Sequence, residues 1–246
     1  MTSPDYGLTA LPAAVSSLRP SNPHPQPVAA SVLLPPDTML AHRIHDYAQL
    51  HLPRPTYLHS MRVYAYGLAI AQQCFPEWGV HTGASLKETW FLTAMLHDIG
   101  TTEANLSNTK LSYEFFAGVL ALELLQRPNH GEEGAATATK EQAESVAEAI
   151  FRHQDVQDKG MVSLMTQLIQ LGTLLDNVGA EVPSRWVARQ TIDAVNGKWS
   201  RAGWCGCFRD TVAQEKTLKP YAMVSRIEGF EDAIMANRIT GDGRGN

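Results

Sequence analysis

Apolar residues recur at helical spacing through most of the chain, and no stretch alternates strictly between apolar and polar positions. Between residues 56 and 74, for example, apolar side chains return every three or four positions, at Tyr57, Met61, Tyr64, Leu68 and Ala71. Proline, glycine and asparagine separate such segments. The pattern predicts long helices over about 37–52, 56–74, 85–98, 111–126, 140–153, 162–178 and 184–196, and short ones near 208–216 and 223–236. We therefore expect an all-α fold with a single domain.

The first 36 residues differ from the rest because eight prolines interrupt them. Proline fixes φ and removes an amide donor, so we expect an irregular, proline-rich arm over residues 1–36. The apolar stretch 28–34 within it is expected to lie on the globular body. The helical domain then spans residues 37–238, and residues 239–246 are expected to form a flexible tail.

Composition narrows the class of protein. The chain has 246 residues, of which 44% are hydrophobic, and this is enough to bury a core. Its 20 basic and 25 acidic residues give a net charge of -5, which argues against a nucleic-acid partner and against attachment to anionic membranes. No apolar run reaches transmembrane length. Three cysteines are too few for a disulfide framework, so a cytoplasmic or nuclear location is expected.

The strongest chemical signal is the pair His97-Asp98 at the end of an apolar helical segment, where Gly100 can stop the helix. Imidazole and carboxylate together suit a divalent transition metal. The alternative is a histidine that caps the helix beside a surface aspartate, but the apolar approach favours the metal. A second pair, His45-Asp46, lies on a polar helix face without a following glycine, and we interpret it as solvent-exposed.

A metal at His97-Asp98 needs further ligands from other segments. His59 lies early in the preceding helical segment between apolar neighbours, although alone it is more typical of a core histidine. Asp176 lies near the end of a leucine-rich helix, where a buried carboxylate is costly unless it is paired or bound to a cation. A surface position on the last helical turn is the equal alternative for Asp176.

The order His59, His97-Asp98, Asp176 resembles the HD superfamily of metal-dependent enzymes, whose ligands lie on separate helices of a bundle. The resemblance implies an HD-type helical bundle. Some members hold a second metal through additional histidines, but this chain has no His-His pair between Asp98 and Asp176. One metal per chain is therefore expected.

Longer blocks resemble one branch of that superfamily, the fungal cyanamide hydratases; they are residues 96–102, 111–115, 149–155, 167–171, 176–179 and 191–196. The resemblance implies hydration of the nitrile group of cyanamide, a small uncharged substrate, to urea. It also implies zinc bound by His59, His97, Asp98 and Asp176, although such ligands also accept iron, manganese or nickel. Zinc-bound hydroxide would attack the nitrile carbon, since zinc lowers the pKa of bound water to about 7.

Three residues are candidates for catalytic roles. His153 closes a helix and is the first candidate for a proton donor or a substrate-orienting group; the alternative is that it satisfies helix carbonyls. Asp98 can assist proton removal from bound water. Thr173 shares a helix face with Asp176 and can hydrogen-bond substrate or a ligand, although a bond to its own helix is slightly favoured. So small a substrate predicts a small, closed and mostly apolar pocket.

Two other functions stay open. An HD-type phosphohydrolase acting on a nucleotide would need a basic pocket for phosphate. The basic residues near the motifs that could form one are Arg62, Lys110 and Arg152. A catalytically inactive HD scaffold used for binding would lack a metal. Lys110 and Glu114, which follow the loop after the His-Asp pair, can line the pocket, although a surface position is expected for each. The apolar helical surface predicts a homo-oligomer.

Overall fold

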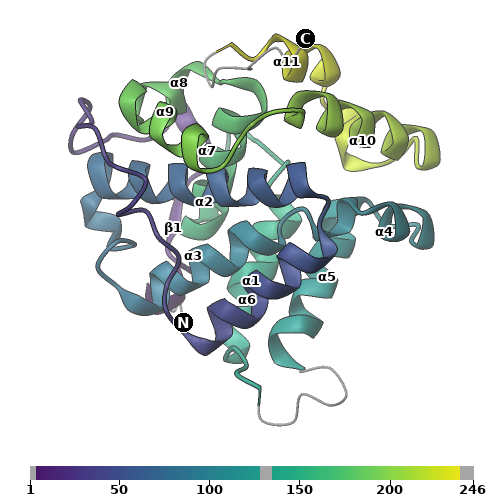
Figure 1. The fold of residues 1–246 in the computed structure, drawn as a ribbon, viewed down its shortest axis with the longest axis horizontal. Coiled ribbons are helices and arrows are strands. Elements are labelled where there is room, and N and C mark those ends of the chain that lie inside the picture. The colour runs from purple at the N-terminus through teal and green to yellow at the C-terminus, as the bar shows by residue number, and fades with distance from the viewer. Residues whose placement is uncertain (1–3, 128–134, 239–246) are drawn as a thin grey trace.

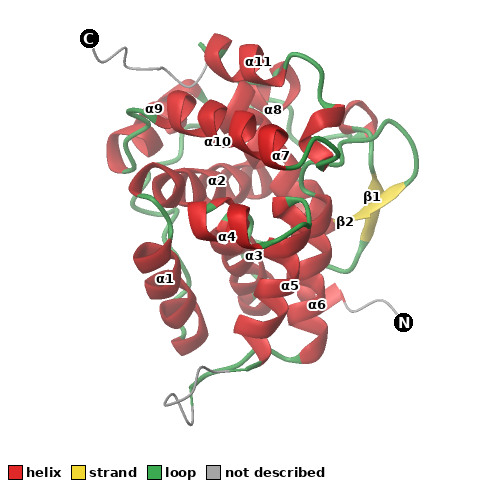
Figure 2. Cartoon of the chain, turned by 90° about the vertical axis from the view of Figure 1, so that its right-hand side faces the viewer, coloured by secondary structure: helices red, strands yellow, loops and turns green. Residues whose placement is uncertain are grey.

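A computed structural model describes residues 4–127 and 135–238. Helices dominate this part of the chain, which confirms the all-α fold (Figures 1 and 2). The α-helices are α1 (Met39–His51), α2 (Arg54–Cys74), α3 (Ala84–Leu96), α4 (Glu103–Asn108), α5 (Tyr113–Gln126), α6 (Lys140–Arg152), α7 (Leu164–Val178), α8 (Glu181–Arg185), α9 (Arg189–Lys198), α10 (Trp204–Leu218) and α11 (Phe230–Ala236). Short 3-10 helices are η1 (Pro4–Tyr6), η2 (Val15–Ser17), η3 (Pro76–Trp78), η4 (Ile99–Thr101) and η5 (Met223–Arg226).

Helix α2 is the centre of the bundle. It crosses the middle of the molecule, with α8 to α11 on one side and α1, α3, α5 and α6 on the other, while α7 packs against α2, α3 and α6 (Figure 1). Small residues allow the neighbouring helices to approach closely: a Cβ at Gly67 would lie 2.3 Å from the Trp90 ring of α3. A Cβ at Gly172 of α7 would lie 2.9 Å from Val63 of α2. These approaches bring α2, α3 and α7, the three helices that carry the predicted ligands, around one point.

Several boundaries differ from those expected. The single helix predicted over 184–196 is two helices, α8 and α9, with residues 186–188 between them. Helix α10 spans Trp204–Leu218, so it begins earlier than the short helix that the sequence predicted near 208–216. Glycines at 203 and 206, which are unfavourable in helices, obscured the helical pattern in the sequence. Trp204, Phe208 and Val212 form the buried face of this helix. The short helix α4 was not predicted.

The proline-rich arm packs on the helical body. Its segment β1 (Ala10–Pro12) pairs antiparallel with β2 (Met161–Ser163), a small sheet that was not predicted from the sequence. Val28 and Leu33 are buried in the main core, as the apolar stretch 28–34 indicated. The amide of Val28 donates a hydrogen bond of 2.7 Å to Thr191 Oγ1 on α9. The arm is thus joined to the domain at both of its ends.

Other expectations stay predictions. The domain limits at residues 36 and 238 are not tested, and the tail 239–246 lies outside the described residues. In the described part of the chain, every helix is too short or too polar to span a bilayer. The cytoplasmic or nuclear location and the homo-oligomeric state also remain predictions.

Candidate metal centre

The His97-Asp98 pair lies where the chain leaves α3. The helix ends at Leu96, His97 keeps helical dihedrals, and Asp98 departs from them at φ -103° before η4 begins. This change of direction allows two adjacent side chains to face the same space, and both are buried. Gly100 is required here because a Cβ would lie 2.1 Å from the carbonyl oxygen of Tyr113. The glycine therefore allows η4 to pack directly on the start of α5.

His59 from α2 completes a buried triad with this pair. Its Nε2 lies 3.2 Å from His97 Nε2 and 3.6 Å from Asp98 Oδ2. His97 Nε2 lies 3.3 Å from the same carboxylate oxygen. Ligand atoms about 2.0–2.1 Å from a tetrahedral zinc ion are about 3.3–3.5 Å apart, so the spacing fits such an ion.

Hydrogen bonds behind the rings determine which atoms face the centre of the triad. His59 Nδ1 lies 2.5 Å from Asp176 Oδ2, and His97 Nδ1 lies 2.8 Å from the carbonyl oxygen of Ala94. Both acceptors require a proton on Nδ1, which leaves the lone pair on each Nε2. No described residue donates a hydrogen bond to Asp98 Oδ2. Three acceptor atoms thus converge without a donor, and a metal cation is the partner that they fit.

The charges in the triad agree with this fit. Burial lowers the pKa of His59 to about 4, so its ring is neutral at pH 7. Burial alone would raise the pKa of Asp98, but the neighbouring histidines, His97 first, hold it well below its usual range. The pKa of His97 is raised because attraction to Asp98 outweighs burial. A metal ion would compete with a proton for His97.

Asp176 lies on the Nδ1 side of His59 and is held by two arginines. Arg62 forms a bidentate pair with it, with Nε–Oδ1 and Nη2–Oδ2 distances of 2.9 and 2.8 Å. Arg201 Nε lies 3.3 Å from Oδ1, and its Nη2 donates to the Asp176 carbonyl oxygen. Burial alone would raise the pKa of Asp176, but Arg62 and its other partners hold it well below its usual range. As placed, Asp176 orients His59; its role as a direct ligand stays a prediction.

Sequence reasoning did not find the arginines as partners of Asp176. Arg62 lies one turn after His59 on α2, so helical spacing places both residues on one face. That signal was available, whereas nothing local links Arg201 to a carboxylate 25 positions earlier. The sequence also did not indicate that Trp204 contacts His59. The Trp204 ring stacks on the His59 ring, with centroids 4.0 Å apart and 10° between the planes.

His153 follows α6 and reaches the edge of the triad. Its Nδ1 lies 2.8 Å from the Ile150 carbonyl oxygen, so it satisfies its helix, as the alternative interpretation proposed. Its Nε2 nevertheless lies 3.8 Å from Asp98 Oδ1 and 3.5 Å from the Tyr113 hydroxyl. Burial lowers the pKa of His153 to about 4, so the ring is neutral at pH 7.

A cavity of about 440 Å³ opens beside His153 and Thr173. It is larger than the small closed pocket expected from the sequence. Leu174, Ile227 and Phe230 are among its apolar lining residues. The Thr173 hydroxyl donates to the Ile169 carbonyl oxygen at 2.8 Å, as the alternative interpretation proposed, while the residue lines the cavity.

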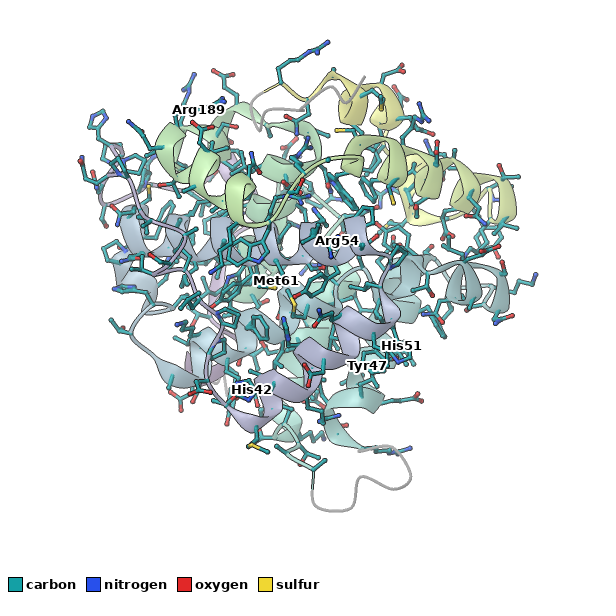
Figure 3. The ribbon with its side chains drawn as sticks, in the orientation of Figure 1. His42, Tyr47, His51, Arg54, Met61 and Arg189 are labelled. Atoms are coloured by element: carbon teal, nitrogen blue, oxygen red, sulfur yellow. The ribbon has the colours of Figure 1, made fainter. Side chains whose placement is uncertain are left out.

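Two further expectations meet different outcomes. Glu114 is fully buried, so the surface position expected for it is wrong. The His45-Asp46 pair is not part of the triad: Asp46 is exposed, as expected, but His45 is half-buried, stacked on Phe91, with its Nε2 2.7 Å from the Tyr57 hydroxyl. Other polar residues of α1 are also at the surface, including His42 and His51, which Figure 3 labels.

Fold and site together define an all-α protein with a buried two-histidine, one-aspartate cluster that can hold a metal ion. No family model matches the chain. Two proteins of Saccharomyces cerevisiae, named cyanamide hydratase DDI2 and cyanamide hydratase DDI3, are each 32% identical to it over 233 residues. The alignments cover 94% of this chain and 96% of each relative. The chain therefore belongs to the cyanamide hydratase family.

Proposed function

We propose that this protein hydrates cyanamide to urea at the His59-His97-Asp98 cluster. The observation that carries the proposal is the convergence of three buried acceptor atoms, separated by 3.2 to 3.6 Å, in a member of this family. The reaction adds water across the nitrile bond to give isourea, which tautomerises to urea. It needs a nucleophile at the carbon and a proton at the nitrogen.

The metal in this proposal is zinc, one ion per chain, held by His59, His97 and Asp98. Bound there, zinc would act as a Lewis acid and would lower the pKa of water to about 7, which is the chemistry that hydration of a nitrile needs at neutral pH. Asp176 orients His59 through Nδ1, as carboxylates commonly do behind metal-bound histidines. Iron, manganese or nickel would accept the same donors. Elemental analysis of the purified protein identifies the ion.

The surrounding side chains bind substrate and move protons. Asp98 Oδ1 faces His153 Nε2 at 3.8 Å, so these two groups can accept the proton that water loses. The Thr173 hydroxyl donates its hydrogen bond to the Ile169 carbonyl oxygen, so towards a substrate its oxygen can act only as an acceptor. That acceptor suits the amino group of cyanamide.

A nucleotide phosphohydrolase is less compatible with these contacts. Arg62 and Arg201 are buried against Asp176 and do not face the cavity. Of the described residues that line the cavity, Arg226 is the one cation, and it lies 3.4 Å from Asp155. A phosphate group would find little positive charge here. The intact cluster of three convergent ligand atoms likewise argues against an inactive scaffold.

The chain provides a matched control for the test, because it contains two His-Asp pairs. His97→Ala and Asp98→Ala should abolish both zinc binding and urea formation. His45→Ala and Asp46→Ala should leave zinc stoichiometry and turnover unchanged. Zinc is measured by elemental analysis and urea by a coupled assay. Full urea formation by a zinc-free Asp98→Ala protein would refute the mechanism, and phosphate release from nucleotides without urea formation would refute the function.

A further inference from the structure

Tyr113, the first residue of α5, has a buried hydroxyl group beside the proposed site. Its ring is fully buried, and its oxygen lies 3.5 Å from His153 Nε2. The side-chain amide of Gln154 donates a hydrogen bond to the same oxygen. His153 and Gln154 both line the cavity. The hydroxyl therefore contacts two residues that line the cavity, one of which, His153, also lies 3.8 Å from Asp98 Oδ1.

The backbone of Tyr113 is held from two directions. Its amide donates a hydrogen bond of 3.0 Å to Glu215 Oε1, a buried carboxylate of α10. Its carbonyl oxygen lies against Gly100 of η4, so closely that a Cβ there would overlap it. This support on both sides preorganises the hydroxyl relative to the His97-Asp98 turn, and preorganised donors stabilise developing charge most effectively.

The hydrogen bonds also establish where the hydroxyl proton points. His153 donates through Nδ1 to the Ile150 carbonyl oxygen, so its Nε2 carries a lone pair. The side-chain amide of Gln154 donates to a lone pair of the Tyr113 hydroxyl oxygen, so the Tyr113 proton must point elsewhere. The Tyr113 proton is then directed at His153 Nε2, which itself faces Asp98 Oδ1. A substrate nitrogen that entered from the cavity beside His153 would meet this donor.

Addition of an oxygen nucleophile to a nitrile places negative charge on the nitrogen, where a fixed donor is most useful. Burial raises the pKa of Tyr113 well above its usual range, with Asp98 and Glu114 acting in the same direction. The phenol consequently keeps its proton at neutral pH. Thr173, which lines the cavity, instead donates its hydroxyl hydrogen bond to the Ile169 carbonyl oxygen.

We propose that Tyr113 is a further catalytic residue, whose hydroxyl donates a hydrogen bond to the nitrile nitrogen as charge develops there. The inference rests on the proposed cyanamide hydration. It assigns Tyr113 to the nitrogen and Thr173 to the amino end of the substrate. The two hydroxyls then differ in role because Tyr113 donates over 3.5 Å to a side chain of the site, which a substrate nitrogen can replace, whereas Thr173 donates to a carbonyl oxygen of its own helix.

The test compares Tyr113→Phe with Tyr64→Phe in the zinc-loaded full chain. Tyr64 is the matched control because it is equally buried and its hydroxyl donates to the Leu34 carbonyl oxygen at 3.0 Å. Loss of one charge-stabilising donor lowers kcat by about 100-fold or more. Tyr113→Phe should show that fall with unchanged zinc stoichiometry and a much smaller change in KM, whereas Tyr64→Phe should keep kcat.

A spectroscopic readout is independent of turnover. The ¹⁵N resonance of His153 Nε2 should move in Tyr113→Phe, because its donor is lost, and should not move in Tyr64→Phe. Unchanged kcat or an unmoved His153 resonance in Tyr113→Phe would overturn the inference. If Tyr113→Phe fails to fold, the inference is tested with difluorotyrosine at position 113. Its hydroxyl is a stronger hydrogen-bond donor, so kcat should change, and an unchanged kcat would overturn the inference. Wild-type protein that forms no urea would overturn the proposed function as well.

Discussion

Replacing Glu114 with glutamine removes a buried charge while it keeps the shape of the side chain. Glu114 lies in the first turn of α5, is fully buried, and receives no hydrogen bond from another described residue on either carboxylate oxygen. Burial raises its pKa from 4.5 to about 7, and the nearby carboxylate of Glu215 acts in the same direction. Ionising this group in the folded protein is therefore costly.

The size of the cost follows from the change in pKa. Each unit corresponds to about 1.4 kcal/mol, so a rise from 4.5 to about 7 corresponds to roughly 3 kcal/mol. Because the folded state holds the proton more tightly than the unfolded state, the cost is absent below about pH 4.5. It grows as the pH rises towards 7 and stays constant above that pH. Glu114→Gln should therefore be more stable than wild type at pH 8, by up to about 3 kcal/mol, with little difference at pH 4.5.

The assay is guanidinium unfolding of both proteins at several pH values between 4.5 and 8. Glu123→Gln is the matched control, because Glu123 lies on the same helix and is exposed. The control should follow the wild-type pH dependence. If the free energies of unfolding of wild type and Glu114→Gln stay parallel from pH 4.5 to 8, Glu114 does not bear a buried charge and the reasoning is wrong.

Other substitutions test the remaining contacts of the site. Asp176→Asn should weaken zinc binding by about 10- to 100-fold in a competition titration, because the group orients a ligand; complete loss of zinc would instead make Asp176 a direct ligand. Gly100→Ala should lower the free energy of unfolding by about 1–3 kcal/mol through overlap with Tyr113, whereas Gly206→Ala, whose Cβ would meet open space, should not. His153→Gln should keep zinc and lower kcat by about 10²- to 10⁴-fold; a variant that loses zinc would assign His153 to the metal.

Local sequence signals were sufficient for most of the long helices and for the His97-Asp98 pair. His97-Asp98 could be recognised because its apolar approach and the following glycine are contained within one short segment. The alternative pair at His45-Asp46 could be set aside by the same criterion, its polar flanks. The helical spacing of apolar residues also placed α2, α6 and α7 to within a few positions. In each case the physical cause, burial of one face, acts between residues that are near in the sequence.

Long-range contacts were not available in that way. Asp176 could be identified as a carboxylate in an apolar helix that needs a partner, but Arg62 and Arg201 come from other segments. Glu114 has a polar side chain near the end of a loop, which is typical of the surface. It is buried because α10 and η4 pack around the start of α5, and no pattern within α5 indicates that they do.

The pairing of the proline-rich arm has a consequence for the order in which the chain is assembled. Thr9 accepts a hydrogen bond from the amide of Leu164, the first residue of α7, and Ala10 is paired with Ser163. Ribosomes add about 5–20 residues per second, so the arm leaves the ribosome roughly 8–30 seconds before its partner strand exists. The arm must therefore stay undocked until β2 and α7 have been synthesised. Nascent chains that stall before residue 161 would carry an unpaired arm and lack α7, so they would also be without Asp176.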